Sequence, residues 1–329
     1  MRNRLAICLL PLALTFAGVA VHAQTPGAAP VEEKFPSRPI RLMVGFAPGG
    51  GTDISARIIA PKMGELIGQT VVVENRPGAN GDIASAALIR SAPDGYTILL
   101  TTIGSLAINS HMPGGTSFDP LKDFTYLSLG VYFPNVIVVQ SKSKIKTLQQ
   151  YIAAGKTKET EVFYGSSGSG STGHLAGELL KARSGMNSQH VNYKGGGPAM
   201  SDLLGGNITA VVASAPTAVP LVQTGKLTAL AVTGAVRAKA LPDVSTVEEQ
   251  GFPGFDAVNW YAFVAPPDMP RPIVDKLNAA IVGALKDPDT IKRLENVGIE
   301  PDPSTPEQMA AYVKKQYDLW GQVVKTIKF

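Results

Sequence analysis

Short apolar runs alternate with amphipathic segments along most of the chain. The first run, Ile40–Gly45, is bounded by glycine and is typical of a buried strand. The segment after it predicts a helix that starts after an N-cap at Thr52 or Asp53 and ends at Gly68. The apolar positions of this helix lie near one face, at Ile54, Ile58, Met63 and Ile67.

The same alternation continues in two series. The first series predicts strands at 40–45, 70–73 and 96–102 and a second helix at 82–90. The second begins near residue 135, where Thr147 and Gln150 form a capping box ahead of a short helix. Its predicted strands are 162–165, 189–193, 208–213 and 227–232. Three further helices are predicted: one that ends near residue 183, one at 198–204 and one at 216–224.

Strands separated by helices of this length indicate βαβ units, so the fold class is α/β with a largely parallel sheet. Residues 270–325 are predicted to be mostly helical and to pack back on the first half. Two sheet-forming halves follow from this pattern, with crossovers near 130–140 and 253–262.

The N-terminus has the layout of a secretory signal peptide. Arg2 and Arg4 precede an uncharged, mostly apolar stretch, and small residues flank a cleavage site before Gln24. An uncleaved membrane anchor is the alternative, although Pro11 interrupts a barely sufficient apolar run. Lipid attachment at Cys8 is disfavoured because Cys8 precedes most of that run. We expect a signal peptide at 1–23, a flexible leader at 24–35 and an exported protein.

Composition narrows the class further. The only cysteine lies in the signal segment, so the mature chain would have no disulfide and would need a large core. Removal of 23 residues from 329 leaves 306, a length that suits two lobes. The formal charge of +4 comes without a basic run, which argues against nucleic acid as a partner. Motifs with metal-ligand spacing, such as HExxH or paired cysteines, do not occur in the sequence.

Two glycine-rich loops carry the candidate chemistry. One spans Gly45–Asp53 and the other Gly165–His174, and each joins a predicted strand to a predicted helix. Helix N-termini attract anions through unpaired N–H groups, and ligands of open α/β sheets sit beyond the carboxyl ends of the strands. Ordinary turns are the alternative for either loop alone, but the matched pair favours an anion site.

The candidate ligand-binding residues follow from this reading. The first loop contributes Phe46, Ala47, Pro48, Gly49, Gly50, Gly51, Thr52 and Asp53. The second contributes Ser166, Ser167, Gly168, Ser169, Gly170, Ser171 and His174. Strand ends and helix starts add Asn80, Thr102, Tyr193 and Ser214, while Trp260 and Tyr261 either line the cleft or pack in the core. Neither loop contains arginine, so backbone N–H groups, hydroxyls and water would hold an anion.

Two other readings of the second loop are weaker. Gly168–Gly173 fits the dinucleotide pattern G-x-G-x-x-G, but no acid occurs between Glu178 and Asp202, where NAD binding requires one. An exported hydrolase would use Ser169 or Ser171 with His174. The sequence has no G-x-S-x-G elbow, and a histidine at a helix start more often caps or packs locally.

Five segments, in order, resemble the Bug family, the periplasmic solute-binding proteins of tripartite tricarboxylate transporters. They are 36–55, 74–84, 165–174, 191–200 and 225–234, and the resemblance runs from about Phe35 to the C-terminus. It implies a two-lobed, type II periplasmic binding protein (Venus flytrap) fold with the site between the lobes. Residues 36–135 with 258–329 would form one lobe, and 136–257 the other.

The resemblance also implies a function. In that family the loops matching Phe46–Asp53 and Ser166–His174 hold a carboxylate, partly through ordered water. The expected ligand is a di- or tricarboxylate, an amino acid or an aromatic carboxylate, delivered to the membrane subunits of the transporter. We therefore expect a periplasmic, monomeric, non-enzymatic binding protein without cofactor or metal, whose lobes close on the ligand.

Overall fold

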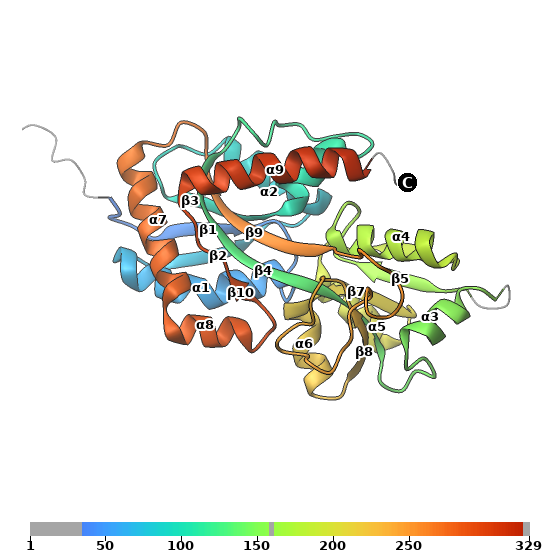
Figure 1. Cartoon of the computed structure of the whole chain (residues 1–329). Coiled ribbons are helices and arrows are strands. Elements are labelled where there is room, and N and C mark those ends of the chain that lie inside the picture. The colour runs from blue at the N-terminus through green and yellow to red at the C-terminus, as the bar shows by residue number, and fades with distance from the viewer. Residues whose placement is uncertain (1–34, 158–160, 325–329) are drawn as a thin grey trace, which may run out of the picture. The chain divides into compact units, whose positions relative to one another are not determined.

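The computed structural model describes residues 35–157 and 161–324. The expected signal peptide at 1–23 and residues 24–34 of the expected leader lie outside these ranges. The described residues form an α/β fold of two lobes (Figure 1). None of their helices is both long enough and apolar enough to cross a membrane.

One continuous sheet of ten strands runs through both lobes, and β4 belongs to both. In the first lobe the order is β2-β1-β3-β9-β4, with β10 added on β4. In the second lobe it is β4-β7-β5-β6, with β8 also on β4. The first-lobe strands are β1 (Ile40–Val44), β2 (Val71–Asn75), β3 (Thr97–Thr102), β9 (Val258–Ala265) and β10 (Glu300–Pro301). The others are β4 (Thr125–Gln140), β5 (Phe163–Ser166), β6 (Gln189–Asn192), β7 (Ala210–Ser214) and β8 (Leu227–Val232).

The prediction of a largely parallel sheet is wrong for the strands that link the lobes. Within each βαβ unit the pairing is parallel, as in β1 with β2 and β3 and in β5 with β6 and β7. β9 runs antiparallel to both β3 and β4, and β4 is antiparallel to β7 and β8. Local patterns predict each βαβ unit, whereas the direction of a strand that returns from the other lobe depends on long-range pairing.

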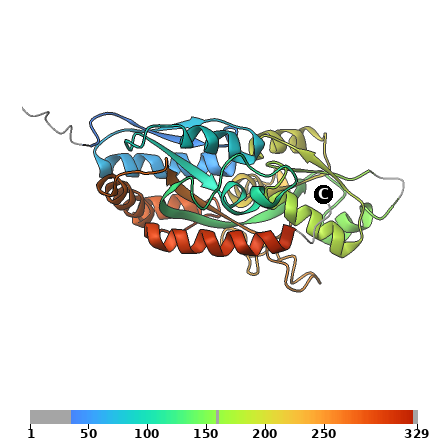
Figure 2. The same ribbon diagram turned by 90° about the horizontal axis from the view of Figure 1, so that it is seen from above.

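The helices cover both faces of the sheet (Figures 1 and 2). In the first lobe, α1, α7 and α8 lie on one face, and α2 and α9 lie on the other. The second lobe carries α3 to α6. Their bounds are α1 (Gly51–Ile67), α2 (Asp82–Ile89), α3 (Leu148–Ala154), α4 (Thr172–Ser184), α5 (Gly196–Gly205), α6 (Ala215–Gln223), α7 (Arg271–Lys286), α8 (Pro288–Glu295) and α9 (Pro306–Val324).

Alternation along the strands divides the core. Leu42 and Val44 point into the cluster beneath α1 and α7, whereas Met43 between them belongs to the cluster beneath α2 and α9. On β4, Val136 joins the same cluster as Leu42, while Ile137 faces a third cluster beneath α3 and α4. The cluster that contains Leu42 therefore continues through β4 into the second lobe.

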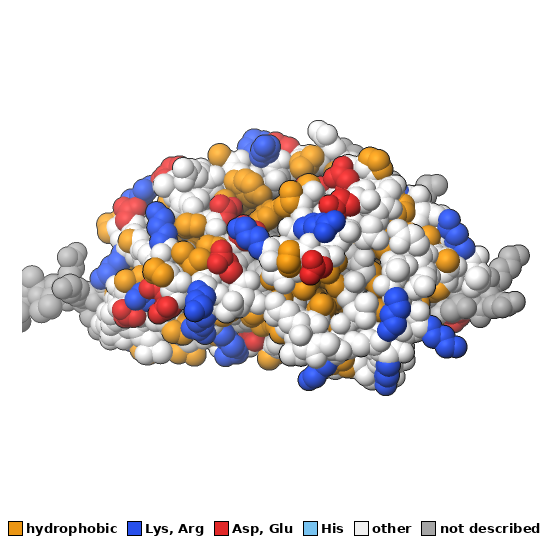
Figure 3. Space-filling model, turned by 60° about the horizontal axis from the view of Figure 1, so that its bottom comes forward, with side chains coloured by type: hydrophobic (Ala, Val, Ile, Leu, Met, Phe, Trp, Pro, Cys, Tyr) orange, Lys and Arg blue, Asp and Glu red, His pale blue; other side chains and the backbone are white. Residues whose placement is uncertain are grey.

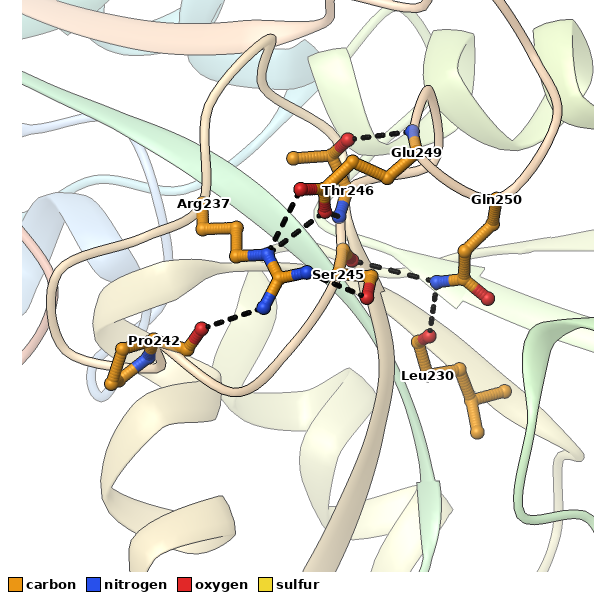
Figure 4. Close-up of polar contacts among 7 residues, drawn as sticks. All are labelled: Leu230, Arg237, Pro242, Ser245, Thr246, Glu249 and Gln250. Carbon is orange, nitrogen blue, oxygen red and sulfur yellow. Dashed lines mark hydrogen bonds and ion pairs between the residues drawn. The ribbon is translucent and has the colours of Figure 1, made fainter.

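The segment between β8 and β9 has little regular structure and is held by side chains (Figure 4). The Nε atom of Arg237 lies 3.0 and 2.9 Å from the two carboxylate oxygens of Glu249, and its guanidinium also donates to the carbonyl of Pro242. Thr246 and Glu249 cap each other, with the backbone N–H of each donating to the other's side chain. These contacts fix the path by which the chain returns to β9.

On the face shown in Figure 3, Lys and Arg side chains lie among Asp and Glu side chains rather than in a patch of one sign. Twelve ion pairs are formed among the described residues, most of them at the surface. Exposed pairs of this kind contribute little to stability, so the buried clusters carry most of it.

Candidate functional site

The first glycine loop is shaped by a buried carboxylate. The helix α1 begins at Gly51 with Gly50 as N-cap, two residues before the predicted cap Thr52 and three before Asp53. Asp53, 4% exposed, accepts from the backbone N–H of Gly49 at 3.0 Å and from Arg57 and Asn75 at 2.9 Å each. Burial raises the pKa of Asp53, but these hydrogen bonds outweigh it and leave the pKa below its usual value. Asp53 thus holds the loop from inside.

The second loop is organised around Ser166, which is fully buried. Its hydroxyl oxygen accepts from the backbone N–H of Gly168 and from the Ser171 hydroxyl, both at 3.2 Å, and lies 2.7 Å from Nε2 of His190. Ser171 is the N-cap of α4, and its hydroxyl accepts from the backbone N–H of His174. Burial, followed by the neighbouring His174 and Lys181, lowers the pKa of His190 to about 3, so this ring is neutral.

Two further helices begin at the same place. Gly196 is the first residue of α5, and Ser214 is the N-cap of α6. Together with the starts of α1 and α4, they surround a small cavity between the lobes, which we call the inner cavity. Its lining is Phe46, Gly50, Gly51, Thr52, Asn80, Thr102, Ile103, Gly104, Ser167, Ser171, Thr172, Gly196, Ser214, Asn259 and Tyr261.

The inner cavity is strongly suited to negative charge. Four helix N-termini point their partial positive charge and unpaired N–H groups toward it, each worth up to about 1 kcal/mol for an anion near the surface and more when partly buried. Among the described residues that line it, none is basic. An anion at this place would be held by backbone dipoles and hydroxyls rather than by an arginine clamp.

The two lobes touch each other around this cavity. The backbone N–H of Ala47 donates to the carbonyl of Lys194 at 3.0 Å. The hydroxyl of Tyr261, on β9, is hydrogen-bonded to Thr52 in the first lobe and to Ser214 in the second, and burial raises its pKa above the usual value. The cavity volume is only about 20 Å³, which is room for about one water. This is a closed arrangement of the cleft.

Glycine is required at two positions where the lobes approach each other. A Cβ atom at Gly51 would lie 2.6 Å from the hydroxyl of Ser214 and 2.9 Å from that of Tyr261. At Gly170, whose φ is +79°, it would lie 2.9 Å from the side-chain oxygen of Asn109. Both glycines are thus explained by close approach, and Gly170 also by its left-handed backbone.

A polar cluster joins the start of α4 to the strands that link the lobes. Asn135 on β4 donates to the Thr172 hydroxyl at 3.3 Å, and Asn259 on β9 donates to the side-chain oxygen of Asn135 at 2.8 Å. The hydroxyl of Thr172 also donates to Asn259. All three side chains are buried, so this cluster fixes the α4 N-terminus to both strands.

A larger cavity of about 330 Å³, which we call the outer cavity, adjoins the inner one and shares Phe46, Asn80 and Ser167 with it. Ala79 and Asn80, with φ of +46° and +49°, form a strained turn on its wall. The full lining is Gly45, Phe46, Gly78, Ala79, Asn80, Asp82, Asn109, Met112, Pro113, Gly115, Ser167, Gly168, Ser169, Asn192, Tyr193 and Lys194.

The structure brings most of the sequence-predicted residues together. Those lining the inner cavity are Phe46, Gly50, Gly51, Thr52, Asn80, Thr102, Ser167, Ser171 and Ser214. Gly168, Ser169 and Tyr193 line the outer one. Neither cavity is lined by Ala47, Pro48, Gly49, Asp53, Ser166, Gly170 or His174, several of which hold the loops in place. Trp260 packs in the core, 1% exposed, whereas Tyr261 reaches the cavity.

Sequence reasoning missed Asp82, Asn109, Gly196 and Asn259. Gly196 stands in a glycine triplet before a predicted helix, the same signal that marked the first two loops. Asp82 lies two residues after the candidate Asn80. Asn109 and Asn259 carry no local signal, because only the tertiary fold brings them to the site.

The histidine considered for hydrolysis belongs to the scaffold of the second loop. Nδ1 of His174 accepts from the backbone N–H of Gly170 at 3.1 Å, and its ring stacks on that of His190 with centroids 4.1 Å apart. Burial is the main cause that lowers the pKa of His174. Across the part of the chain that the structure describes, no group of three or more His, Cys, Asp or Glu side chains is arranged to hold a metal ion.

Comparison with known proteins gives consistent results. Residues 55–329 match the family described as tripartite tricarboxylate transporter family receptor. The chain is 35% identical to protein BugT of Bordetella pertussis over 310 residues, which is 93% of this chain and 95% of BugT.

Solved structures are similar over nearly their whole length. Periplasmic binding protein BugD superposes with a TM-score of 0.83 at 33% identity, covering 89% of this chain and 98% of BugD. The R. palustris protein Rpa4515, solved with adipate, gives a TM-score of 0.85 at 34% identity, covering 89% of this chain and 98% of that protein.

Proposed function

Because the chain belongs to the tripartite tricarboxylate transporter receptor family, we propose that it captures a small carboxylate in the periplasm and delivers it to the membrane subunits of such a transporter. The observation that carries the proposal is the convergence of four helix N-termini on the inner cavity. A carboxylate placed there meets N–H donors and hydroxyls from both lobes. The relative solved with adipate supports a ligand of this class.

The proposed mechanism is closure around the ligand without any covalent step. The ligand contacts both lobes, because α1 belongs to the first lobe and α4 to α6 belong to the second. The ligand binds to one lobe first, and its contacts with the other lobe form as the cleft closes. The Ala47–Lys194 hydrogen bond and the Tyr261 hydroxyl join the lobes when they are closed. Residues 36–135 with 258–329, and 136–257, are proposed to move as the two bodies.

The proposal is tested by screening carboxylates by calorimetry and thermal shift, with the uncharged primary amide of each acid as a matched control. We expect 1:1 binding of at least one carboxylate, a loss of binding for its amide, and recovery of the ligand unchanged. Small-angle scattering with and without ligand measures closure. If no carboxylate binds while an ester or nucleotide is consumed, the proposed function is wrong.

A further inference from the structure

Asp82 is the one carboxylate that lines the outer cavity among the described residues. It is the first residue of α2 and half-buried. Its Oδ1 atom accepts from the Ser105 hydroxyl and from Nδ2 of Asn109, both at 2.8 Å. No hydrogen bond from a described residue reaches the other carboxylate oxygen, Oδ2. The amide nitrogen of Asn109 can only donate, so Oδ1 is held as an acceptor.

The charge of this carboxylate has no counterion among the described residues. Within the described ranges, no Lys, Arg or His forms an ion pair with Asp82. Lys194 is the other charged residue on the cavity wall, but it is exposed to solvent and comes from the opposite lobe. Burial raises the pKa of Asp82 to about 6, and the hydrogen bonds from Asn109 and Ser105 only partly oppose this. The side chain is therefore mainly ionised at neutral pH and costly to bury.

A polar chain connects Asp82 to the inner cavity. Nδ2 of Asn80 donates to Oδ1 of Asn109 at 2.9 Å, and Asn109 in turn donates to Asp82. Because Asn80 lines both cavities, a ligand whose carboxylate enters the inner cavity when the cleft widens would extend past Asn80 toward Asp82.

We propose that Asp82 is a specificity residue that selects carboxylates bearing a positively charged nitrogen and disfavours those bearing a second carboxylate. This inference rests on the proposed function, since it concerns the end of the same ligand that lies opposite the bound carboxylate. A protonated nitrogen donates to Oδ2 and supplies the missing positive charge. A second carboxylate at that position meets a like charge and is rejected.

Matched ligand trios test this selection. Each trio places a methyl, an ammonium or a carboxylate group at one distance from a common carboxylate, such as hexanoate, 5-aminopentanoate and adipate, and three chain lengths are measured by calorimetry at pH 7.5. We expect the ammonium member to bind tightest in at least one trio, by about 10-fold or more over the other two. If the methyl or dicarboxylate member binds tightest at every length, or no ammonium member binds, the inference is overturned.

The variant Asp82→Asn keeps the shape and both hydrogen bonds to Oδ1 but removes the charge. We expect it to lose about 30-fold affinity for the ammonium member and to gain affinity for the dicarboxylate. Asp289→Asn is the matched control, because Asp289 is an exposed acid in the first turn of α8, which has eight residues like α2. Unchanged selectivity in Asp82→Asn, with an intact melting transition, also overturns the inference.

The wild-type protein gives an independent readout that needs no variant. Lowering the pH from 7.5 to 5.5 protonates part of Asp82, so the preference for the ammonium member should fall several-fold. If the preference for the ammonium ligand is the same at pH 7.5 and pH 5.5, the role proposed for Asp82 is contradicted. Failure of all carboxylates to bind would instead contradict the proposed function, whereas carboxylate binding without this selectivity contradicts only the role of Asp82.

Discussion

The backbone N–H of Ala47 donates to the carbonyl oxygen of Lys194 across the cleft at 3.0 Å. One residue lies in the loop after β1 and the other in the turn before α5, so the bond exists only while the lobes are together. It uses backbone atoms, and side-chain substitutions at either position leave donor and acceptor in place. Closure is therefore best tested at neighbouring positions, where side-chain size determines how closely the two lobes can approach each other.

Gly51→Ala should impair closure. The added methyl group lies 2.6 Å from the hydroxyl of Ser214 on the second lobe, so the lobes must move apart. The Tyr261 hydroxyl, 2.9 Å away within the first lobe, must shift as well. We expect at least about a 10-fold loss of ligand affinity, measured by calorimetry, while a cooperative melting transition shows that the variant still folds. Gly205→Ala, where the nearest atom is 3.4 Å away at the end of α5, is the control. Equal affinity of the two variants would show that the approach at Gly51 is unimportant.

Asp53→Asn should destabilise the first loop. The substitution removes the charge that Arg57 contacts and leaves one carboxylate oxygen fewer for Gly49, Arg57 and Asn75. We expect a loss of about 1–3 kcal/mol in the free energy of unfolding at pH 7.5, measured by urea denaturation. The native pKa of Asp53 is lowered, so this stability is present above about pH 4 and is lost as pH falls through the native pKa. A variant as stable as wild type at pH 7.5 refutes this role.

Asp82→Asn should stabilise the ligand-free protein. The native pKa of Asp82, about 6, is above the ordinary value of an aspartate. The contribution of Asp82 to the free energy of unfolding is therefore favourable in acid and is lost as the pH rises from about 4 to 6. At pH 7.5 the variant should be more stable by about 1–3 kcal/mol, and near pH 4 the difference should disappear. Denaturant titrations at both pH values measure it. A constant difference across this range would contradict the raised pKa.

His190→Gln should make the protein less sensitive to acid. Because the native pKa is lowered to about 3, the neutral ring contributes stability above about pH 6.5 that is lost as pH falls toward 3. We expect wild type to lose about 2–3 kcal/mol more than the variant between pH 7 and 4, measured by urea denaturation. His111→Gln, on a histidine bonded to the carbonyl of Tyr317 in the first lobe, is the control. Parallel curves for wild type and His190→Gln would show that the ring is not kept neutral.

The sequence predicted the elements that depend on local chemistry. Strand 227–232 and the end of α1 at Gly68 agree with the structure, because turn glycines and apolar periodicity act over a few residues. The N-cap Thr147 is confirmed by its hydrogen bond from the backbone N–H of Gln150. The family resemblance, with its two-lobed fold, is also confirmed.

The sequence did not predict what depends on distant contacts. β4 begins at Thr125, ten residues before the second series was expected, because its first half pairs with β9 from the far end of the chain. Gly50 replaced Thr52 and Asp53 as N-cap because Asp53 turns inward to bind Arg57 and Asn75. Asp82 was overlooked because only the packing of Ser105 and Asn109 against it places it on a cavity wall.

The polar cluster of Asn135, Thr172 and Asn259 has a mechanical consequence. When two rigid bodies rotate about a pivot, an atom is displaced in proportion to its distance from the axis. Thr172 is bonded to both strands that cross between the lobes, so a rotation that pivots on these strands would leave it nearly in place relative to either body. The deep end of the site would keep its dimensions throughout the motion while the mouth widens. A ligand would then first contact the deep end of the site, whose shape does not change, and would contact the moving residues at the mouth only afterwards.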